Sequence, residues 1–320
     1  MPRDQQRHIT VTDRAGLPYS KGLMASAIMA TGLAPGPAFE VAERIEHQLL
    51  EAERFEITRA ELLDIASQTL SEVVGSRYAD LYRKWQAIER LDLPLVVLIG
   101  GSTGVGKSTI ATQLAARLGI TRVVGTDAIR EVMRSIFNEL MLPTLHTSSF
   151  EADTAVRGPL PRSSDPVIAG FEEQVRAVSV GIDALIQRAV LESTDTIIEG
   201  AHLVPGYISE AWQSKAVVVP LVITVEDEDL HRSHFYLRGQ DSATRNVDRY
   251  LTAFGNIRKV QRYIKSQALQ RGVPVIPSYS LDATLATVID HIVSKAVEQT
   301  ESLGTADDLS VSRGRKASEG

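Results

Sequence analysis

The chain has 320 residues, of which 43% are hydrophobic, and its formal net charge is −6. This balance suits a soluble protein with one large domain and a smaller module, and it argues against a general nucleic-acid binder. The chain contains no cysteine, which excludes disulfides, thiolate nucleophiles and cysteine-ligated metal centres. No apolar run approaches the roughly 20 residues that cross a bilayer. We therefore expect a cytoplasmic protein that binds neither membranes nor nucleic acid, with a homo-oligomer left open.

Residues 1–92 are expected to form a small, mostly helical module that opens with a β-hairpin. Residues 9–12 alternate like a strand, and residues 13–16 have the composition of a turn. Helical patterns follow over residues 21–32, 37–49, 59–74 and 78–91. Pro94 marks the boundary with the next domain.

Residues 93–300 alternate between strands and helices, which predicts an α/β domain. The expected fold is that of the P-loop NTPases, a parallel sheet between two layers of helices. Strands are expected at residues 95–99, 122–124, 196–198, 217–225 and 273–276. Helices are expected at residues 107–118, 127–140, 167–192, 230–270 and 283–297. A long loop over residues 141–166 is expected to cover the site, and residues 301–320 to form a disordered tail.

A complete Walker A motif stands between an apolar strand and an amphipathic helix. It reads Gly101-Ser102-Thr103-Gly104-Val105-Gly106-Lys107-Ser108-Thr109. Its backbone N–H groups can bind phosphates, Lys107 can reach the β- and γ-phosphates, and the Ser108 hydroxyl can bind Mg²⁺. The context favours this over a Gly-rich turn that binds nothing, so we predict ATP and Mg²⁺ as cofactors.

The remaining motifs narrow the class of P-loop protein. The chain has neither the Asn-Lys-x-Asp run of GTPases nor the Leu-Ser-Gly-Gly-Gln signature of ABC-type ATPases. A small-molecule kinase therefore remains.

Asp127 follows the second strand, at the edge of the sheet where open α/β folds bind ligands. Its carboxylate could act as the general base that takes the proton of an acceptor hydroxyl. Arg130 and Arg134 lie three and seven positions further along the same helix face, which suits a small anionic acceptor. The alternatives are that Asp127 is a plain N-cap and that the arginines pair with Glu131 on the surface.

Glu199 ends an apolar strand, where a P-loop enzyme keeps the acid that binds Mg²⁺ or orients the acceptor. The alternative is a strand-end acid that faces solvent. His202 is expected to support the site indirectly or to be structural. Residues 146–149 and Arg157, in the long loop, could add donors to an anionic substrate.

Residues 231–239 begin a charged helical region in which many kinases carry a basic lid. Arg232 and Arg238 are the expected catalytic lid arginines, with Arg245 and Arg249 as partners on one face. Each could instead be a solvated surface charge.

Four segments together resemble the 2-phosphoglycerate kinase family. They are GGSTGVGKST at residues 100–109, TDAIREVMR at residues 126–134, LHTSSFEA at residues 145–152 and IEGAHLVPG at residues 198–206. The segment VTDRAGLPYSKGL, at residues 11–23, resembles the opening of an ATP-cone module, which that family carries ahead of its kinase domain. In the family's phosphate loop we expect Thr-Ser where this chain has Ser102-Thr103, and both orders keep two hydroxyls.

The resemblance implies transfer of phosphate from ATP to the free hydroxyl of 2-phosphoglycerate, which gives 2,3-bisphosphoglycerate and ADP. An acceptor that carries a carboxylate and a phosphate agrees with arginines around one base. For the N-terminal module the resemblance implies nucleotide binding or regulation, and the alternative is a structural or dimerising appendage. Two other functions remain open: a kinase of another phosphorylated or sugar acid, and an ATP-sensing regulator that transfers nothing.

Overall fold

The computed structural model describes residues 9–12, 17–88, 93–212, 214–241 and 247–316. The chain divides into two compact units. Unit 1 comprises residues 1–91, 117–119 and 285–297, and unit 2 comprises residues 92–116, 120–284 and 298–320. Residues 285–297, which the sequence placed with the second domain, thus group with unit 1.

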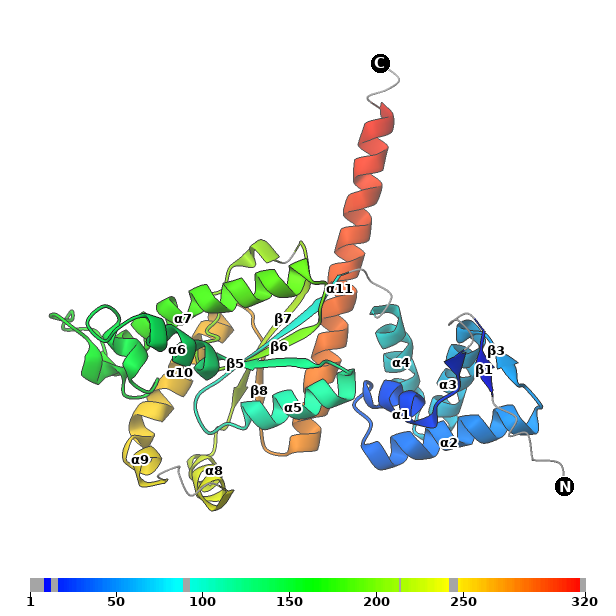
Figure 1. Ribbon diagram of the computed structural model, residues 1–320, viewed down its shortest axis with the longest axis horizontal. Helices are drawn as coiled ribbons and strands as arrows, with labels where there is room; N and C mark the ends of the chain where they lie inside the picture. Colours follow the sequence, from blue (N-terminus) through cyan, green and yellow to red (C-terminus); the bar gives the residue numbers. More distant parts are fainter. Residues whose placement is uncertain (1–8, 13–16, 89–92, 213, 242–246, 317–320) are drawn as a thin grey trace. The chain divides into compact units, whose positions relative to one another are not determined.

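Unit 1 contains short strands, the helices α1 to α4, and residues 285–297 of the last helix, α11 (Leu281–Lys316) (Figure 1). The strands are β1 (Thr10–Val11), β2 (Leu17–Pro18) and β3 (Glu56–Ile57), and the helices are α1 (Lys21–Met29), α2 (Pro35–Glu51), α3 (Arg59–Val73) and α4 (Ser76–Ile88). Strand β1 pairs antiparallel with β2 and parallel with β3, so the expected hairpin is extended by a third strand. That strand was missed because two residues carry no alternation.

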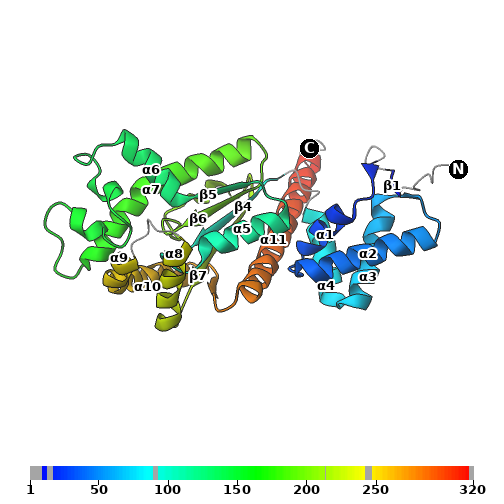
Figure 2. The ribbon, with the colours of Figure 1, turned by 60° about the horizontal axis from the view of Figure 1, so that its bottom comes forward.

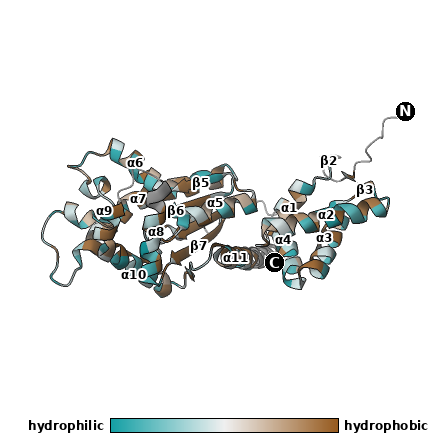
Figure 3. Ribbon diagram, turned by 90° about the horizontal axis from the view of Figure 1, so that it is seen from below, coloured by the Kyte–Doolittle hydropathy of each residue, from teal (hydrophilic) through white to brown (hydrophobic). Residues whose placement is uncertain are grey.

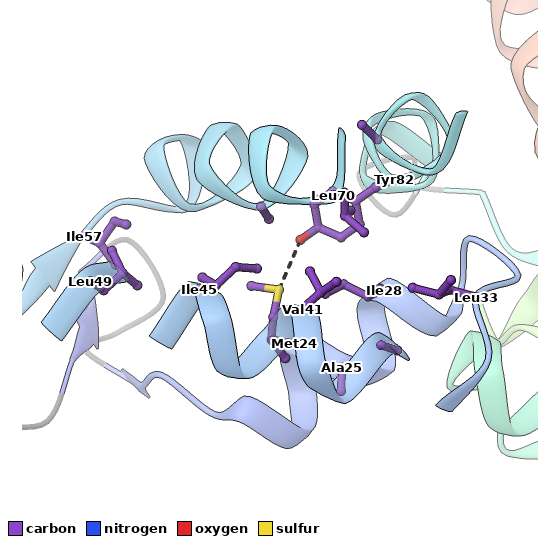
Figure 4. Packing of buried hydrophobic residues seen from close by; sticks show 14 of the residues in the cluster. Met24, Ala25, Ile28, Leu33, Val41, Ile45, Leu49, Ile57, Leu70 and Tyr82 are labelled. Carbon is purple, nitrogen blue, oxygen red and sulfur yellow. Dashed lines mark hydrogen bonds between the residues drawn. The ribbon is translucent and has the colours of Figure 1, made fainter. Parts of the chain in front are cut away.

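The helices of unit 1 are packed around one apolar core (Figure 4). Val41, Ile45 and Leu49 repeat at helical spacing along α2 and are buried. Within the same core the Tyr82 hydroxyl donates to the Met24 sulfur at 3.7 Å. This core is separate from the clusters that line the sheet of unit 2.

Unit 2 contains a five-stranded parallel sheet in the order β5-β6-β4-β7-β8. The strands are β4 (Leu95–Gly100), β5 (Arg122–Gly125), β6 (Thr196–Gly200), β7 (Val217–Thr224) and β8 (Val275–Pro277). The central strands β4, β6 and β7 are mostly buried, as expected for a sheet that is covered on both faces, and Figure 3 shows hydrophobic residues along β6 and β7. The α/β prediction is confirmed.

Helices cover both faces of this sheet, with α7 along one face and α5 along the other (Figures 1 and 2). The helices are α5 (Lys107–Leu118), α6 (Thr126–Ile136), α7 (Pro166–Leu191), α8 (Glu228–Asp241), α9 (Val247–Thr252), α10 (Phe254–Gln270) and α11 (Leu281–Lys316). Between α6 and α7 the loop contains two 3₁₀ turns, Pro143–His146 and Ala152–Ala155. None of the described helices is long and apolar enough to span a membrane.

The largest differences from the sequence predictions concern three helical segments. Helix α6 ends at Ile136 rather than near residue 140, because Phe137 is extended and the Asn138 side chain accepts a hydrogen bond from the Met141 N–H. The stretch predicted as one helix over residues 230–270 is divided into α8, α9 and α10. Helix α11 continues to Lys316, so helical backbone extends into the segment predicted as a disordered tail.

Candidate active site

The phosphate loop joins β4 to α5, and its backbone depends on glycine. Gly104 and Gly106 have φ angles of 90° and 89°, in the left-handed region that favours glycine. A Cβ on Gly101 would lie 2.4 Å from the carbonyl oxygen of Ile223, so this position excludes any side chain. The loop therefore has the shape that lets backbone N–H groups converge on phosphate.

Lys107 and Ser108 begin α5 and lie where the sequence predicted. The Lys107 ammonium donates to the carbonyl of Ser102 at 2.7 Å, which folds the side chain back over the loop. The Ser108 hydroxyl donates to Glu199 Oε1 at 2.8 Å. This contact arises because β6 is parallel to β4, with Glu199 paired to Ile99 immediately before the loop.

Helix α8 contacts the phosphate loop through two histidines. The ring Nε2–H of His231 donates to the carbonyl of Thr103 at 2.8 Å, and the ring Nδ1–H of His234 donates to the carbonyl of Gly104 at 2.8 Å. The Phe235 ring packs so closely that a Cβ on Gly104 would lie 2.4 Å from Phe235 Cζ. Helix α8 thus holds the loop by two hydrogen bonds and one aromatic contact.

The tautomer of His231 follows from its partners. A carbonyl can only accept, so Nε2 carries the proton, and Nδ1 can accept from Arg258 Nη1 at 3.5 Å. Arg258 is itself held by the carbonyls of Val225 and Glu226, at 2.6 and 2.9 Å. Burial lowers the pKa of His231 to about 4, so the ring is neutral near pH 7.

A cluster of aromatic rings continues from Phe235 toward the long loop between α6 and α7. Phe235 stacks on Tyr250 with ring centroids 5.0 Å apart, and Tyr250 contacts Phe150 at 5.8 Å. Arg249, next to Tyr250, pairs with Glu151. The cluster therefore connects the helix that holds the phosphate loop with residues 150–151.

Asp127 lies in the first turn of α6, where Gly125 is the N-cap, so the plain N-cap alternative is wrong. Its side chain is 81% exposed, and its carboxylate lies 3.6 Å from Arg130 Nε. Arg130 is only 12% exposed; its Nη1 donates to the carbonyl of Leu145 at 2.8 Å and its Nη2 to Glu131 at 2.7 Å. Its buried Nε has no hydrogen-bond partner among the described residues.

The other predicted arginines lie in different surroundings. Arg134 pairs with Glu131 at 3.2 Å, which is the surface pairing that the sequence left open. The Arg232 guanidinium lies 3.9 Å from the centre of the Phe254 ring, and 4.0 Å from Glu228. The side chain of Arg238, and the whole of Arg245, lie outside the described residues.

The polar residues of the long loop bind other protein groups. Arg157 donates to the carbonyls of Leu140 and Glu139, at 2.7 and 3.1 Å. The Ser148 hydroxyl accepts from Arg249 at 2.7 Å. The ring Nε2–H of His146 donates to the carbonyl of Phe137 at 2.9 Å. These side chains therefore hold the loop in the structure described.

His202, at the end of β6, is fully buried and bonded through both ring nitrogens. Its Nδ1 lies 2.9 Å from the Thr126 hydroxyl, and its Nε2 lies 2.9 Å from Gln174 Oε1. The Gln174 amide donates in turn to the carbonyls of Thr144 and Thr147. Burial lowers the pKa of His202 to about 4, so this ring is also neutral near pH 7.

Comparison with known proteins decides the family. No family model matches the chain. A 2-phosphoglycerate kinase of Pyrococcus furiosus is 39% identical over 293 residues, which cover 91% of this chain and 95% of that protein. The 2-phosphoglycerate kinase of Methanothermobacter thermautotrophicus is 39% identical over 89% of this chain and 93% of that protein. The chain belongs to the 2-phosphoglycerate kinase family.

One less similar relative and one solved structure were also found. The 2-phosphoglycerate kinase of Methanocaldococcus jannaschii is 33% identical over 95% of this chain and 97% of that protein. A solved structure from Chloroflexus aurantiacus is 14% identical and covers 63% of this chain and 98% of that chain, with a TM-score of 0.33. The latter is too distant to carry an argument.

Several residues around the phosphate loop of this 2-phosphoglycerate kinase family member were not predicted from sequence. His231, His234 and Phe235 share one helix face by their spacing of three and four, a signal that was present beside the two arginines. Thr126 and Gln174 gave no local signal, because their partners are 76 and 28 residues away.

Proposed function

We propose that the chain transfers the γ-phosphoryl group of ATP to the free hydroxyl of 2-phosphoglycerate, giving 2,3-bisphosphoglycerate and ADP. Family membership supports the substrate, and one observation of the site carries the proposal. The buried Arg130 Nε has no hydrogen-bond partner among the described residues and lies 3.6 Å from Asp127, which is exposed at the same edge of the sheet as the phosphate loop. A carboxylate base beside an arginine donor suits an anionic acceptor with a hydroxyl.

The donor half of the site is the phosphate loop, residues 101–109. Its backbone N–H groups and the start of α5 favour the phosphates of ATP by charge. In this proposal the Lys107 ammonium leaves the Ser102 carbonyl and stabilises the charge that develops on the transferring phosphoryl group.

Mg²⁺ is the cofactor that we propose for this site, and Ser108 with Glu199 would hold it. Their oxygens are already adjacent at 2.8 Å. Mg²⁺ usually keeps several waters and binds one or two protein oxygens together with substrate phosphates, so two side-chain oxygens suit it. When bound, the ion would neutralise charge on the phosphates.

The acceptor half is proposed to centre on Asp127. Its carboxylate takes the proton of the acceptor hydroxyl while that oxygen bonds to the γ-phosphorus and the bond to the leaving ADP oxygen breaks. Arg130, whose guanidinium lies beside this carboxylate, places positive charge next to an acidic group of the acceptor. Arg134, Arg232 and Arg238 are proposed to add positive charge at the rim, Arg134 and Arg232 by exchanging their present partners for substrate.

The test is an assay that couples ADP release to a chromogenic reaction, run with 2-phosphoglycerate, 3-phosphoglycerate, glycerate and gluconate. The proposal expects the highest kcat/KM with 2-phosphoglycerate. A preference for another of these acids would overturn the named acceptor. No stimulation by any of them would favour an ATP-sensing protein that transfers nothing.

For unit 1 we propose nucleotide binding, as its ATP-cone-like sequence implies. A cavity of about 270 Å³ in this unit is lined mainly by apolar side chains, and Tyr19, Trp85 and Gln86 also line it. The test is the ATP-binding stoichiometry of the unchanged chain, measured by calorimetry. Two ATP per chain support the proposal, and one supports a structural or dimerising role.

A further inference from the structure

A buried chain of hydrogen bonds joins the first turn of α6 to the loop that follows it. Thr126, His202 and Gln174 come from α6, the end of β6 and α7, and each is buried. Their three side chains connect the residue before Asp127 with the backbone of residues 144–147. The structure assigns these three residues a positioning role for the acceptor half, an assignment that rests on the proposed function.

The donor and the acceptor of each hydrogen bond in this buried network can be assigned. The Gln174 amide nitrogen donates to the carbonyls of Thr144 and Thr147, so its Oε1 is the atom that faces His202. An amide oxygen only accepts, so His202 Nε2 carries the proton and Nδ1 has a lone pair. The Thr126 hydroxyl therefore donates to Nδ1. With each donor matched to an acceptor, the network specifies one arrangement of its members.

The approach of Thr126 to the end of β6 depends on a glycine. A Cβ on Gly200 would lie 1.7 Å from the Thr126 hydroxyl oxygen, which is closer than any two non-bonded atoms can be. The absence of a side chain at this position lets the hydroxyl reach His202. Thr126 is buried, whereas the neighbouring Asp127 carboxylate is 81% exposed. The hydrogen bond from Thr126 to His202 therefore fixes the first turn of α6 on its buried side and leaves the carboxylate accessible.

At its other end, the hydrogen-bond network binds the loop that follows α6. Gln174 binds the carbonyls of Thr144 and Thr147, and Arg130 binds the carbonyl of Leu145 between them. Three backbone carbonyls within residues 144–147 are therefore bound by side chains that lie on α6 or are linked to it through buried hydrogen bonds. Loss of the hydroxyl at Thr126 should displace Asp127 and the loop relative to each other, and the phosphate loop should remain unchanged.

The test compares Thr126→Val, which removes the hydroxyl at similar volume, with Thr126→Ser, which keeps it. A third variant, Gln174→Glu, keeps an acceptor for His202 and removes both donors to the loop. For Thr126→Val and Gln174→Glu we expect the KM for 2-phosphoglycerate to rise about tenfold or more, because buried groups lose their partners, and the KM for ATP to stay within about twofold. In Thr126→Ser, the KM for 2-phosphoglycerate and the KM for ATP should both stay close to those of the unchanged chain.

Hydrogen–deuterium exchange on the full chain gives a second readout that needs no acceptor. Exchange in residues 143–150 should accelerate in Thr126→Val and Gln174→Glu but not in Thr126→Ser. Unchanged exchange, or equal losses in the two KM values, would overturn the positioning role. If the unchanged chain fails to phosphorylate 2-phosphoglycerate, the proposed function fails, and the exchange result still decides whether the three residues fix the loop.

Discussion

The two buried neutral histidines predict a loss of stability in mild acid. His202 and His231 each have a pKa lowered from 6.5 to about 4 by burial. Well above pH 6.5 these rings are neutral in both the folded and the unfolded state, so their contribution to the free energy of unfolding does not change with pH. As the pH falls below 6.5, the unfolded chain binds protons that the folded chain does not, and the free energy of unfolding decreases until the pH passes about 4.

The magnitude follows from the two shifts. A lowering from 6.5 to about 4 corresponds to about 3 kcal/mol per histidine at the acid limit, and to about 2 kcal/mol per histidine at pH 5. The two histidines together would thus remove about 4 kcal/mol of unfolding free energy between pH 7 and pH 5. That is a large part of the roughly 5–15 kcal/mol that stabilises a typical domain.

The assay is urea unfolding of the full chain, followed by circular dichroism at pH 7 and pH 5. The double variant His202→Gln/His231→Gln should be less stable than the unchanged chain at pH 7 but lose less on acidification. Carboxylates whose pKa values are lowered by ion pairs, such as Glu151 and Glu226, contribute equally to both proteins and cancel in the difference. His47→Gln, at an exposed histidine, is the matched control. An equal pH dependence in the double variant and the unchanged chain would refute the argument.

Three further predictions concern the phosphate loop and the base. Lys107→Ala should abolish measurable turnover, because the charge on the transferring phosphoryl group loses its ammonium, and residual turnover near the unchanged rate would contradict that role. Asp127→Asn should lower kcat by about 10²-fold or more with ATP affinity nearly unchanged, as isothermal calorimetry can check; a normal kcat would exclude the base. Gly104→Ala should weaken ATP binding measured by the same method, since the new Cβ would lie 2.4 Å from Phe235 Cζ, whereas Ala at Gly255, with open space around it, should not.

The local parts of the fold and the site could be predicted from sequence. The phosphate loop was predicted because its glycines, lysine and serine are consecutive, and the surrounding strand and helix have clear periodicity. Ser108 and Glu199 were each predicted as Mg²⁺ ligands, Glu199 from its position at a strand end, and in the structure their side chains are hydrogen-bonded to each other. Parallel strand pairing carries this information, since it brings the carboxyl ends of β4 and β6 together.

The rest depends on tertiary contacts that periodicity does not encode. His202 was expected to support the site indirectly or to be structural, and it is buried between Thr126 and Gln174. Neither partner could be inferred without the packing of α7 on the sheet. The segment after β7 was interpreted through its arginines because lids are usually basic. In the structure, His231 and His234 on the same helix bind carbonyl groups of the phosphate loop.

The aromatic cluster from Phe235 through Tyr250 to Phe150 has a consequence for the order in which ligands act. At one end of this cluster, Phe235 packs against Gly104 of the phosphate loop. At the other end, Phe150 belongs to the long loop that also contains residues 144–147. If ATP stiffens this cluster, less conformational entropy is left for the acceptor to remove, and the acceptor binds more tightly. Thermodynamic reciprocity then requires that the acceptor tighten ATP by the same factor. We expect the two dissociation constants to be linked in this way, with Tyr250 as the residue whose truncation uncouples them.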